Sequence, residues 1–183
     1  MLPATARRFT RGFTLIELMI VVAVVGILAT LGVYGVGKYI RSSKTSEAIQ
    51  MIGAIKAAQE SYKSETFTYL NVSTSLTDYY PAAPDAHAHS WGDASTNAGR
   101  AFRTLGVSAD APVRFGYAST AGGANAVPSA HGTSLTITGW PTAAMNSPWY
   151  VVRAASDLDG DGTLGFLVSA SFLGQIAIDR EGE

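Results

Sequence analysis

The first part of the chain is apolar all round, and the part that follows is apolar on one side only. No charged residue occurs from Leu18 to Val36, and about 20 apolar residues let a helix cross the core of a bilayer. The next apolar positions recur at three- and four-residue steps opposite a polar face, which indicates an amphipathic helix. They are Ile40, Ala48, Ile49, Ile52, Ile55, Ala58 and Tyr62. Because no proline occurs from Phe13 to Tyr80, we expect one helix from about Phe13 to about Ser64.

The rest of the chain predicts a head rich in β-strands. The region from Asn71 to Arg100 contains Pro81, Pro84 and many small polar residues, which indicates loops. Alternating or β-branched segments then predict strands, at residues 113–117, 134–138, 149–154, 164–169 and 175–178. We therefore expect an α+β fold. Its long N-terminal helix, membrane-spanning in the first half and amphipathic in the second, packs on a C-terminal antiparallel β-sheet.

Composition narrows the class of protein. The chain has 183 residues, of which 47% are hydrophobic and 15% charged, and this size fits one modest domain plus a membrane segment. Cysteine is absent, so neither a disulfide nor a thiolate metal site can form. The formal net charge is −1 and no basic tract is present, which argues against a nucleic-acid partner.

Glu17 stands out because a lone carboxylate near the start of an apolar helix is costly in hydrocarbon without a partner or a task. Three arginines, Arg7, Arg8 and Arg11, precede it. A secretory signal has an apolar core of about 7–15 residues followed by its cleavage site, whereas this core is longer and a glycine precedes it. Cleavage after Gly12 would remove the arginines and leave the helix on the product.

The run Gly12-Phe13-Thr14-Leu15-Ile16-Glu17-Leu18, followed by the apolar residues Met19–Ala29, resembles the start of a type IV pilin or pseudopilin precursor. The resemblance implies that a prepilin peptidase cuts between Gly12 and Phe13 and methylates the new Phe13 amine. Phe13 and Glu17 then act in assembly. It also implies three parts: a leader at 1–12, a pilin helix at 13–64 and a head at 65–183. Residues 13–36 of the helix would span the membrane and later form the filament core.

On this resemblance the chain is a structural subunit of a type IV pilus that serves motility and adhesion, and not an enzyme. No catalytic signature occurs in the sequence. The implied partners are further copies of the chain, the prepilin peptidase, the inner-membrane assembly machinery and, before assembly, the membrane itself. The protein would be a single-pass inner-membrane protein first and part of a cell-surface pilus afterwards.

Two alternatives stay open within the family. One is a type II secretion pseudopilin in a periplasmic filament, with which an aspartate-rich loop near the C-terminus is compatible. The other is a minor tip pilin with an adhesin or DNA-uptake role. The long irregular region from Asn71 to Arg100 slightly favours a pilin at the surface.

The segment Asp157-Leu158-Asp159-Gly160-Asp161-Gly162 places carboxylates at alternate positions, where a tight loop can direct them at one calcium ion. Val168 stands at the position where a complete EF-hand loop has its glutamate. Asp-Gly is also a strong signal for a hairpin turn without an ion. The sequence thus leaves two interpretations, a calcium site formed by Asp157, Asp159 and Asp161, or a turn alone.

Two alternate histidines, His87 and His89, are a weak candidate for zinc because no cysteine or third histidine lies nearby. We favour a solvated loop at this place. His131 is isolated among small residues.

The first prediction concerns processing. The mature chain should begin at Phe13, because a cut there deletes all three leader arginines and spares the apolar helix. N-terminal sequencing or the intact mass of membrane-derived protein measures this. A product that starts after Ala29, or filaments made of uncut chains, would contradict it.

Overall fold

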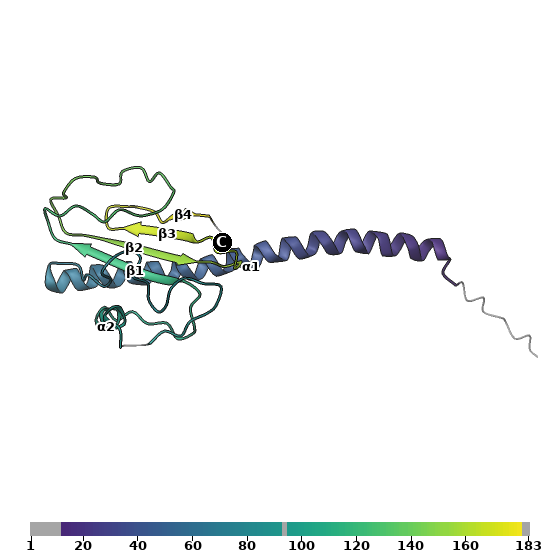
Figure 1. Cartoon of the computed structure of the whole chain (residues 1–183), viewed down its shortest axis with the longest axis horizontal. Helices are drawn as coiled ribbons and strands as arrows, with labels where there is room; N and C mark the ends of the chain where they lie inside the picture. Colours follow the sequence, from purple (N-terminus) through teal and green to yellow (C-terminus); the bar gives the residue numbers. More distant parts are fainter. Residues whose placement is uncertain (1–11, 93–94, 181–183) are drawn as a thin grey trace, which may run out of the picture. The chain divides into compact units, whose positions relative to one another are not determined.

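The computed structural model of the chain describes residues 12–92 and 95–180 (Figure 1). The elements are α1 (Leu15–Thr66), α2 (Asn97–Thr104), β1 (Gly116–Gly122), β2 (Trp149–Ser156), β3 (Gly165–Ala170) and β4 (Ala177–Asp179). The residues divide into two compact units, Met1–Tyr39 and Ile40–Glu183, and α1 contributes to both. The predicted α+β fold, a long N-terminal helix followed by an antiparallel sheet, is confirmed.

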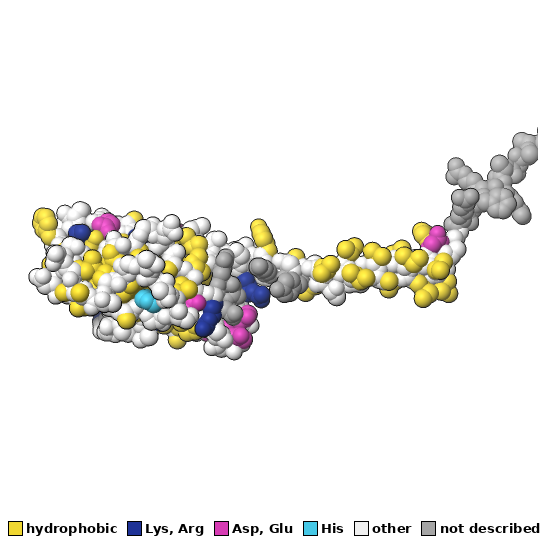
Figure 2. Space-filling model, turned by 90° about the horizontal axis from the view of Figure 1, so that it is seen from above, with side chains coloured by type: hydrophobic (Ala, Val, Ile, Leu, Met, Phe, Trp, Pro, Cys, Tyr) yellow, Lys and Arg dark blue, Asp and Glu magenta, His cyan; other side chains and the backbone are white. Residues whose placement is uncertain are grey.

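Among the described residues of the first unit, α1 has no core to pack against. Every side chain from Gly12 to Val33 is exposed, and apolar side chains cover this part of the helix (Figure 2). Leu15, for example, is 75% exposed and Leu31 is 67% exposed. Such a surface requires cover from lipid or from other helices.

In the second unit, which we call the head, one stripe of α1 is buried. Its buried residues are Thr45, Ala48, Ile52, Ile55 and Gln59, and their three- and four-residue spacing keeps them on one face. The predicted apolar face was wrong at Ile40 and Ile49, which are 49% and 40% exposed. Ile49 lies about 100° around the helix from Ala48, so it falls outside the stripe.

Gln59 is fully buried and fixes the chain after α1 ends. Its side-chain amide donates to the carbonyl of Leu70 at 2.8 Å, and its amide oxygen accepts the N–H of Leu70 at 3.0 Å. The same amide donates to Oγ of Ser119 in β1 at 3.3 Å. One side chain therefore joins the helix, the segment that returns from it and the sheet.

The sheet has the order β1-β2-β3-β4, and all neighbouring strands are antiparallel. The registers pair Gly116 with Ala155 and Phe166 with Asp179. β2 lies inside the sheet and is buried along its whole length. Its side chains enter two cores: Tyr150, Val152 and Ala154 join the buried residues of α1, whereas Trp149 and Val151 join a second cluster.

The second cluster lies under the irregular segment between β1 and β2, drawn green in Figure 1. Ile137 and Trp140 of this segment pack against it. Arg153, itself buried, holds the segment by donating to the carbonyls of His131 and Gly132 at 3.2 Å and 3.3 Å. The segment therefore covers one face of the sheet.

The predicted strand at 134–138 was wrong, because these residues lie in that covering segment and form no strand. Their burial does alternate, as the sequence pattern implied. However, they meet the sheet through its face instead of pairing with the backbone of an edge strand. Alternating apolar and polar residues indicate that one side of a segment is buried. They do not distinguish a segment that lies on the face of a sheet from a strand that pairs with its edge.

The other predicted strands shift by a few residues. The strand expected at 113–117 begins at Gly116 and continues to Gly122 as β1, and those expected at 149–154, 164–169 and 175–178 correspond to β2, β3 and β4. The helix α2 was missed. It begins where the hydroxyl of Thr96 accepts the N–H of Gly99 at 3.0 Å, an N-cap that the sequence carries.

Replacing Gln59 tests the buried amide. Gln59→Ala should lower the free energy of unfolding of the head by about 2–3 kcal/mol, because it leaves both polar backbone groups of Leu70 without their partner. Denaturant unfolding of the full chain in detergent, followed by tryptophan fluorescence, measures this, since Trp91, Trp140 and Trp149 all lie in the head.

Gln50→Ala is the matched control. Gln50 is exposed on the same helix, so its replacement should change stability by less than about 0.5 kcal/mol while carrying the same change in helix propensity. Equal midpoints for the two variants would contradict the role given to Gln59.

Candidate assembly and metal sites

The first candidate site is the beginning of α1, where Thr14 and Glu17 cap the helix reciprocally. The backbone N–H and the hydroxyl of Thr14 donate to Oε2 of Glu17 at 2.8 Å and 2.7 Å. In return, the N–H of Glu17 donates to Oγ1 of Thr14 at 3.3 Å. This arrangement is a capping box, in which two side chains satisfy N–H groups that the first turn leaves unpaired.

The capping box holds the Glu17 carboxylate at the N-terminal end of the helix, where the helix dipole favours negative charge. Sequence reasoning selected Glu17 for its cost in an apolar environment and missed Thr14. The signal was present, because Thr14-Leu15-Ile16-Glu17 has the spacing of a capping box before an apolar run.

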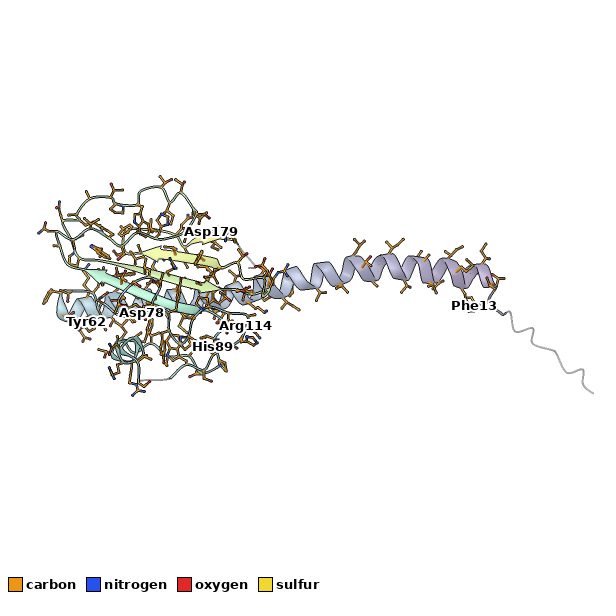
Figure 3. The ribbon with its side chains drawn as sticks, in the orientation of Figure 1. Phe13, Tyr62, Asp78, His89, Arg114 and Asp179 are labelled. Carbon is orange, nitrogen blue, oxygen red and sulfur yellow. The ribbon has the colours of Figure 1, made fainter. Side chains whose placement is uncertain are left out.

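Gly12 and Phe13, expected to flank a cleavage site, lie directly before Thr14. Both precede the helix, and the Phe13 side chain is 82% exposed (Figure 3). The helix that follows is long and apolar enough, by length and composition, to cross a membrane. The structure therefore brings the expected processing residues, the carboxylate and the apolar surface onto one short stretch of chain.

The second candidate site is the loop that joins β2 to β3. Oδ1 of Asp157 accepts the N–H of Gly160 at 2.7 Å, and its Oδ2 accepts the N–H of Gly162 at 3.0 Å. The two glycines have φ of 79° and 88°, a conformation that side-chain-bearing residues rarely adopt. One carboxylate oxygen from each of Asp157, Asp159 and Asp161 lies within 4.8 Å of the others.

This donor set suits a hard cation in part. Calcium takes six to eight oxygen ligands, and the loop brings three carboxylates together, with Thr163 at the seventh position, where an EF-hand loop uses a backbone carbonyl. Val168, at the twelfth position, is fully buried in β3, so no carboxylate closes the set there. Any ion at this loop would keep water among its ligands.

The structure pairs the two neighbouring histidines with Asp85. Nε2 of His89 lies 2.8 Å from Oδ1 of this aspartate, and Nδ1 of His87 lies 3.6 Å from Oδ2. The hydrogen bond from His89 and the backbone N–H of His87 lower the pKa of Asp85. His131 instead contacts Oγ1 of Thr133 at 2.9 Å.

A third feature, a basic cluster of Arg41, Lys44 and Arg114, was missed. No local sequence pattern places Arg114 beside α1, because it lies 70 positions after Lys44. Burial lowers the pKa of Lys44, and the charges of Arg114 and Arg41 lower it further. Lys44 therefore lies close enough to both arginines to be affected by their charges.

Comparison with known proteins gives a consistent result. The family described as "Prokaryotic N-terminal methylation motif" matches residues 7–33. The chain is 51% identical over 59 residues to the type IV major pilin protein PilA of Myxococcus xanthus, covering 32% of this chain and 27% of that protein. It is 42% identical over 59 residues to the fimbrial protein EcpC of Eikenella corrodens, covering 32% of this chain and 39% of that protein.

It is also 46% identical over 63 residues to the type II secretion system core protein G of Pseudomonas aeruginosa, covering 34% of this chain and 44% of that protein. Less than half the length of each of these relatives is spanned by its match. No solved structure matches the chain.

The methylation motif, the apolar helix and the helix-plus-sheet fold together support a precursor similar to those of type IV pilins and pseudopilins. The resemblance drawn from the sequence is thereby confirmed.

Proposed function

We propose that this chain is a structural subunit of a type IV pilus. Its leader is cut between Gly12 and Phe13, and its first helix joins those of other copies in the core of a filament. The observation that carries the proposal is the apolar surface of α1 from Leu15 to Val33, which is exposed on every side. The first turn of this segment carries the capped carboxylate of Glu17. The match to the Myxococcus pilin supports it.

Assembly of such helices would cover their apolar side chains and would provide the Glu17 carboxylate with a counter-charge. Apolar side chains that lipid covers in the membrane are covered by neighbouring helices in the filament. A carboxylate inside that core requires a counter-charge, and the new Phe13 amine of an adjacent subunit supplies one. Head-to-tail contacts of this kind do not close on themselves, so they generate an open fibre.

The proposed route is a membrane stage followed by a surface stage. The subunit would sit in the inner membrane as a single-pass protein until the assembly machinery draws it into the filament. Its role would be structural and not catalytic. Motility and adhesion are the proposed uses of the pilus.

Replacing Glu17 tests the pairing. Glu17→Ala should leave the subunit in the membrane but reduce sheared surface filaments at least about tenfold, since loss of one partner of a buried ion pair costs about 3–5 kcal/mol. Filament yield is measured in cells whose only copy of the gene is the variant.

Glu17→Gln is the informative control, because glutamine can complete a capping box but carries no charge. If the ion pair matters, this variant fails as the alanine variant does. Filament yields restored by glutamine would assign Glu17 to helix capping and reject the pairing.

A type II secretion pseudopilin is the second candidate, favoured by the match to core protein G and compatible with the aspartate-rich loop. Its filament would stay in the periplasm. A deletion strain separates the two candidates: loss of surface filaments with normal secretion supports the pilin, and loss of protein secretion supports the pseudopilin.

We also propose that Asp157, Asp159 and Asp161 hold a calcium ion that stabilises the head. Three carboxylates whose oxygens lie within 4.8 Å repel one another without a cation. The chain has no cysteine, so no disulfide can secure the β2–β3 connection.

Calcium should therefore raise the melting temperature of the protein. At a free concentration one hundred times the dissociation constant, a ligand adds about 2.7 kcal/mol to stability. Thermal melting in calcium and in excess chelator measures this. Asp159→Ala and Asp161→Ala should remove the difference, whereas Asp110→Ala, an exposed aspartate of another loop, should keep it. Equal melting of the unaltered protein in both conditions would leave the loop as a turn alone.

A further inference from the structure

The basic cluster is built by two parts of the chain that are distant in sequence. Arg41 and Lys44 lie three residues apart on α1, and so nearly one above the other. Arg114 is brought to them by its backbone N–H, which donates to Oε1 of Glu47 at 2.9 Å. Figure 3 places Arg114 at one end of the head, and Figure 2 shows basic side chains with acidic ones beside them at one end of the head.

The cations of the cluster have no acidic partner among the residues that the structure describes. None of these three side chains forms an ion pair there within 4.0 Å. The carboxylate of Glu47 lies beside the cluster, where it accepts the N–H of Arg114 and, at 3.5 Å, the hydroxyl of Tyr117. All three cations are only partly exposed, so their charges are held together at the cost of mutual repulsion.

The aspartate-rich loop begins close by, but among the described residues it forms no ion pair with the cluster within 4.0 Å. Oγ of Ser156 donates to the carbonyl of Arg114 at 3.0 Å, and Asp157 follows directly. Nη1 of Arg114 nevertheless donates to the carbonyl of Ala86, at 3.4 Å. The guanidinium therefore keeps donors that a further anion can use.

The position of the basic cluster along α1 indicates the chemical class of the anion that it would bind. Arg41 follows Val36, the last residue of the uncharged apolar run, by five residues of the same helix. Five residues advance a helix by about 7.5 Å, and the headgroup layer of a bilayer is about 5–8 Å deep on each side. Long basic side chains near the end of a spanning helix reach back to that layer.

We propose that Arg41, Lys44 and Arg114 form a docking surface for the phosphates of anionic phospholipid headgroups, which orients the head on the membrane before assembly. The inference rests on the proposed function in that it takes the apolar segment to be inserted in a bilayer. Two of the cations lie on α1 and the third lies shortly before β1, so the contact depends on the folded head as well as on the helix. A head held in this way presents a fixed face to the next subunit.

The experiment uses the absence of cysteine, which makes any introduced cysteine a unique labelling site. His87→Cys is placed beside Ala86, which contacts Arg114, and the side chain of His87 is 83% exposed. Phe67→Cys is the distant control, because Phe67 directly follows α1 and is 81% exposed. Each full chain is reconstituted into vesicles and labelled from outside with an impermeant donor dye.

Energy transfer to a tracer of headgroup-labelled lipid then reports the distance from each dye to the surface. Vesicles of phosphatidylcholine alone are compared with vesicles that also contain phosphatidylglycerol. We expect more transfer from position 87 in the anionic vesicles, a loss of that gain at high salt, and no such dependence from position 67.

Variants assign the effect to the cluster. Each of Arg41→Gln, Lys44→Gln and Arg114→Gln should weaken the association of the head with the anionic surface about fivefold, the effect of one basic residue near such a surface. Arg114→Lys should retain it. Arg100→Gln, which removes an exposed cation from α2, should change nothing.

The outcomes separate this inference from the proposed function. A chain that does not float with vesicles at all would overturn membrane insertion and this inference with it. A chain that floats normally but shows equal transfer in both lipids would overturn the inference alone. Transfer that depends on the three cations in neutral vesicles, and grows with the protein-to-lipid ratio, would assign the cluster to a second copy of the chain instead.

Discussion

The first part of α1 has no cover among the residues that the structure describes. From Gly12 to Val33 every side chain is exposed, and most of them are apolar. An apolar helix surface of this kind is favourable where lipid or other helices cover it. Membrane insertion and filament formation are two ways to meet the same constraint, which links both stages of the proposed route.

The carboxylate of Glu17 adds a second constraint at the same place. Within the single chain, Thr14 satisfies it through a capping box, which lowers the cost of a charged group at the edge of an apolar segment. The charge itself still lacks a counter-ion among the described residues. The Glu17 carboxylate therefore has its hydrogen bonds within the single chain. In the proposed filament it would be stabilised further by an ion pair with the Phe13 amine of a neighbouring copy.

The head uses ordinary packing to hold the second half of the helix. Ile52 and Ile55 enter a core shared with β2, and Gln59 ties the helix to the segment that leaves it. On the other face of the sheet, Arg153 holds the covering segment by hydrogen bonds to backbone carbonyls. Polar side chains with several partners therefore join distant segments of this cysteine-free head.

The sequence by itself determined the features that depend on neighbouring residues: the long helix, its change from uniform to one-sided apolarity, the motif around Glu17 and the close approach of Asp157, Asp159 and Asp161. Local spacing sets each of these, so they can be derived without a fold. Only the tertiary structure decided that residues 134–138 cover a face of the sheet, and that Arg114 joins Arg41 and Lys44. Both depend on which distant segments meet, and periodicity carries no information about that because packing and long-range hydrogen bonds select the partner.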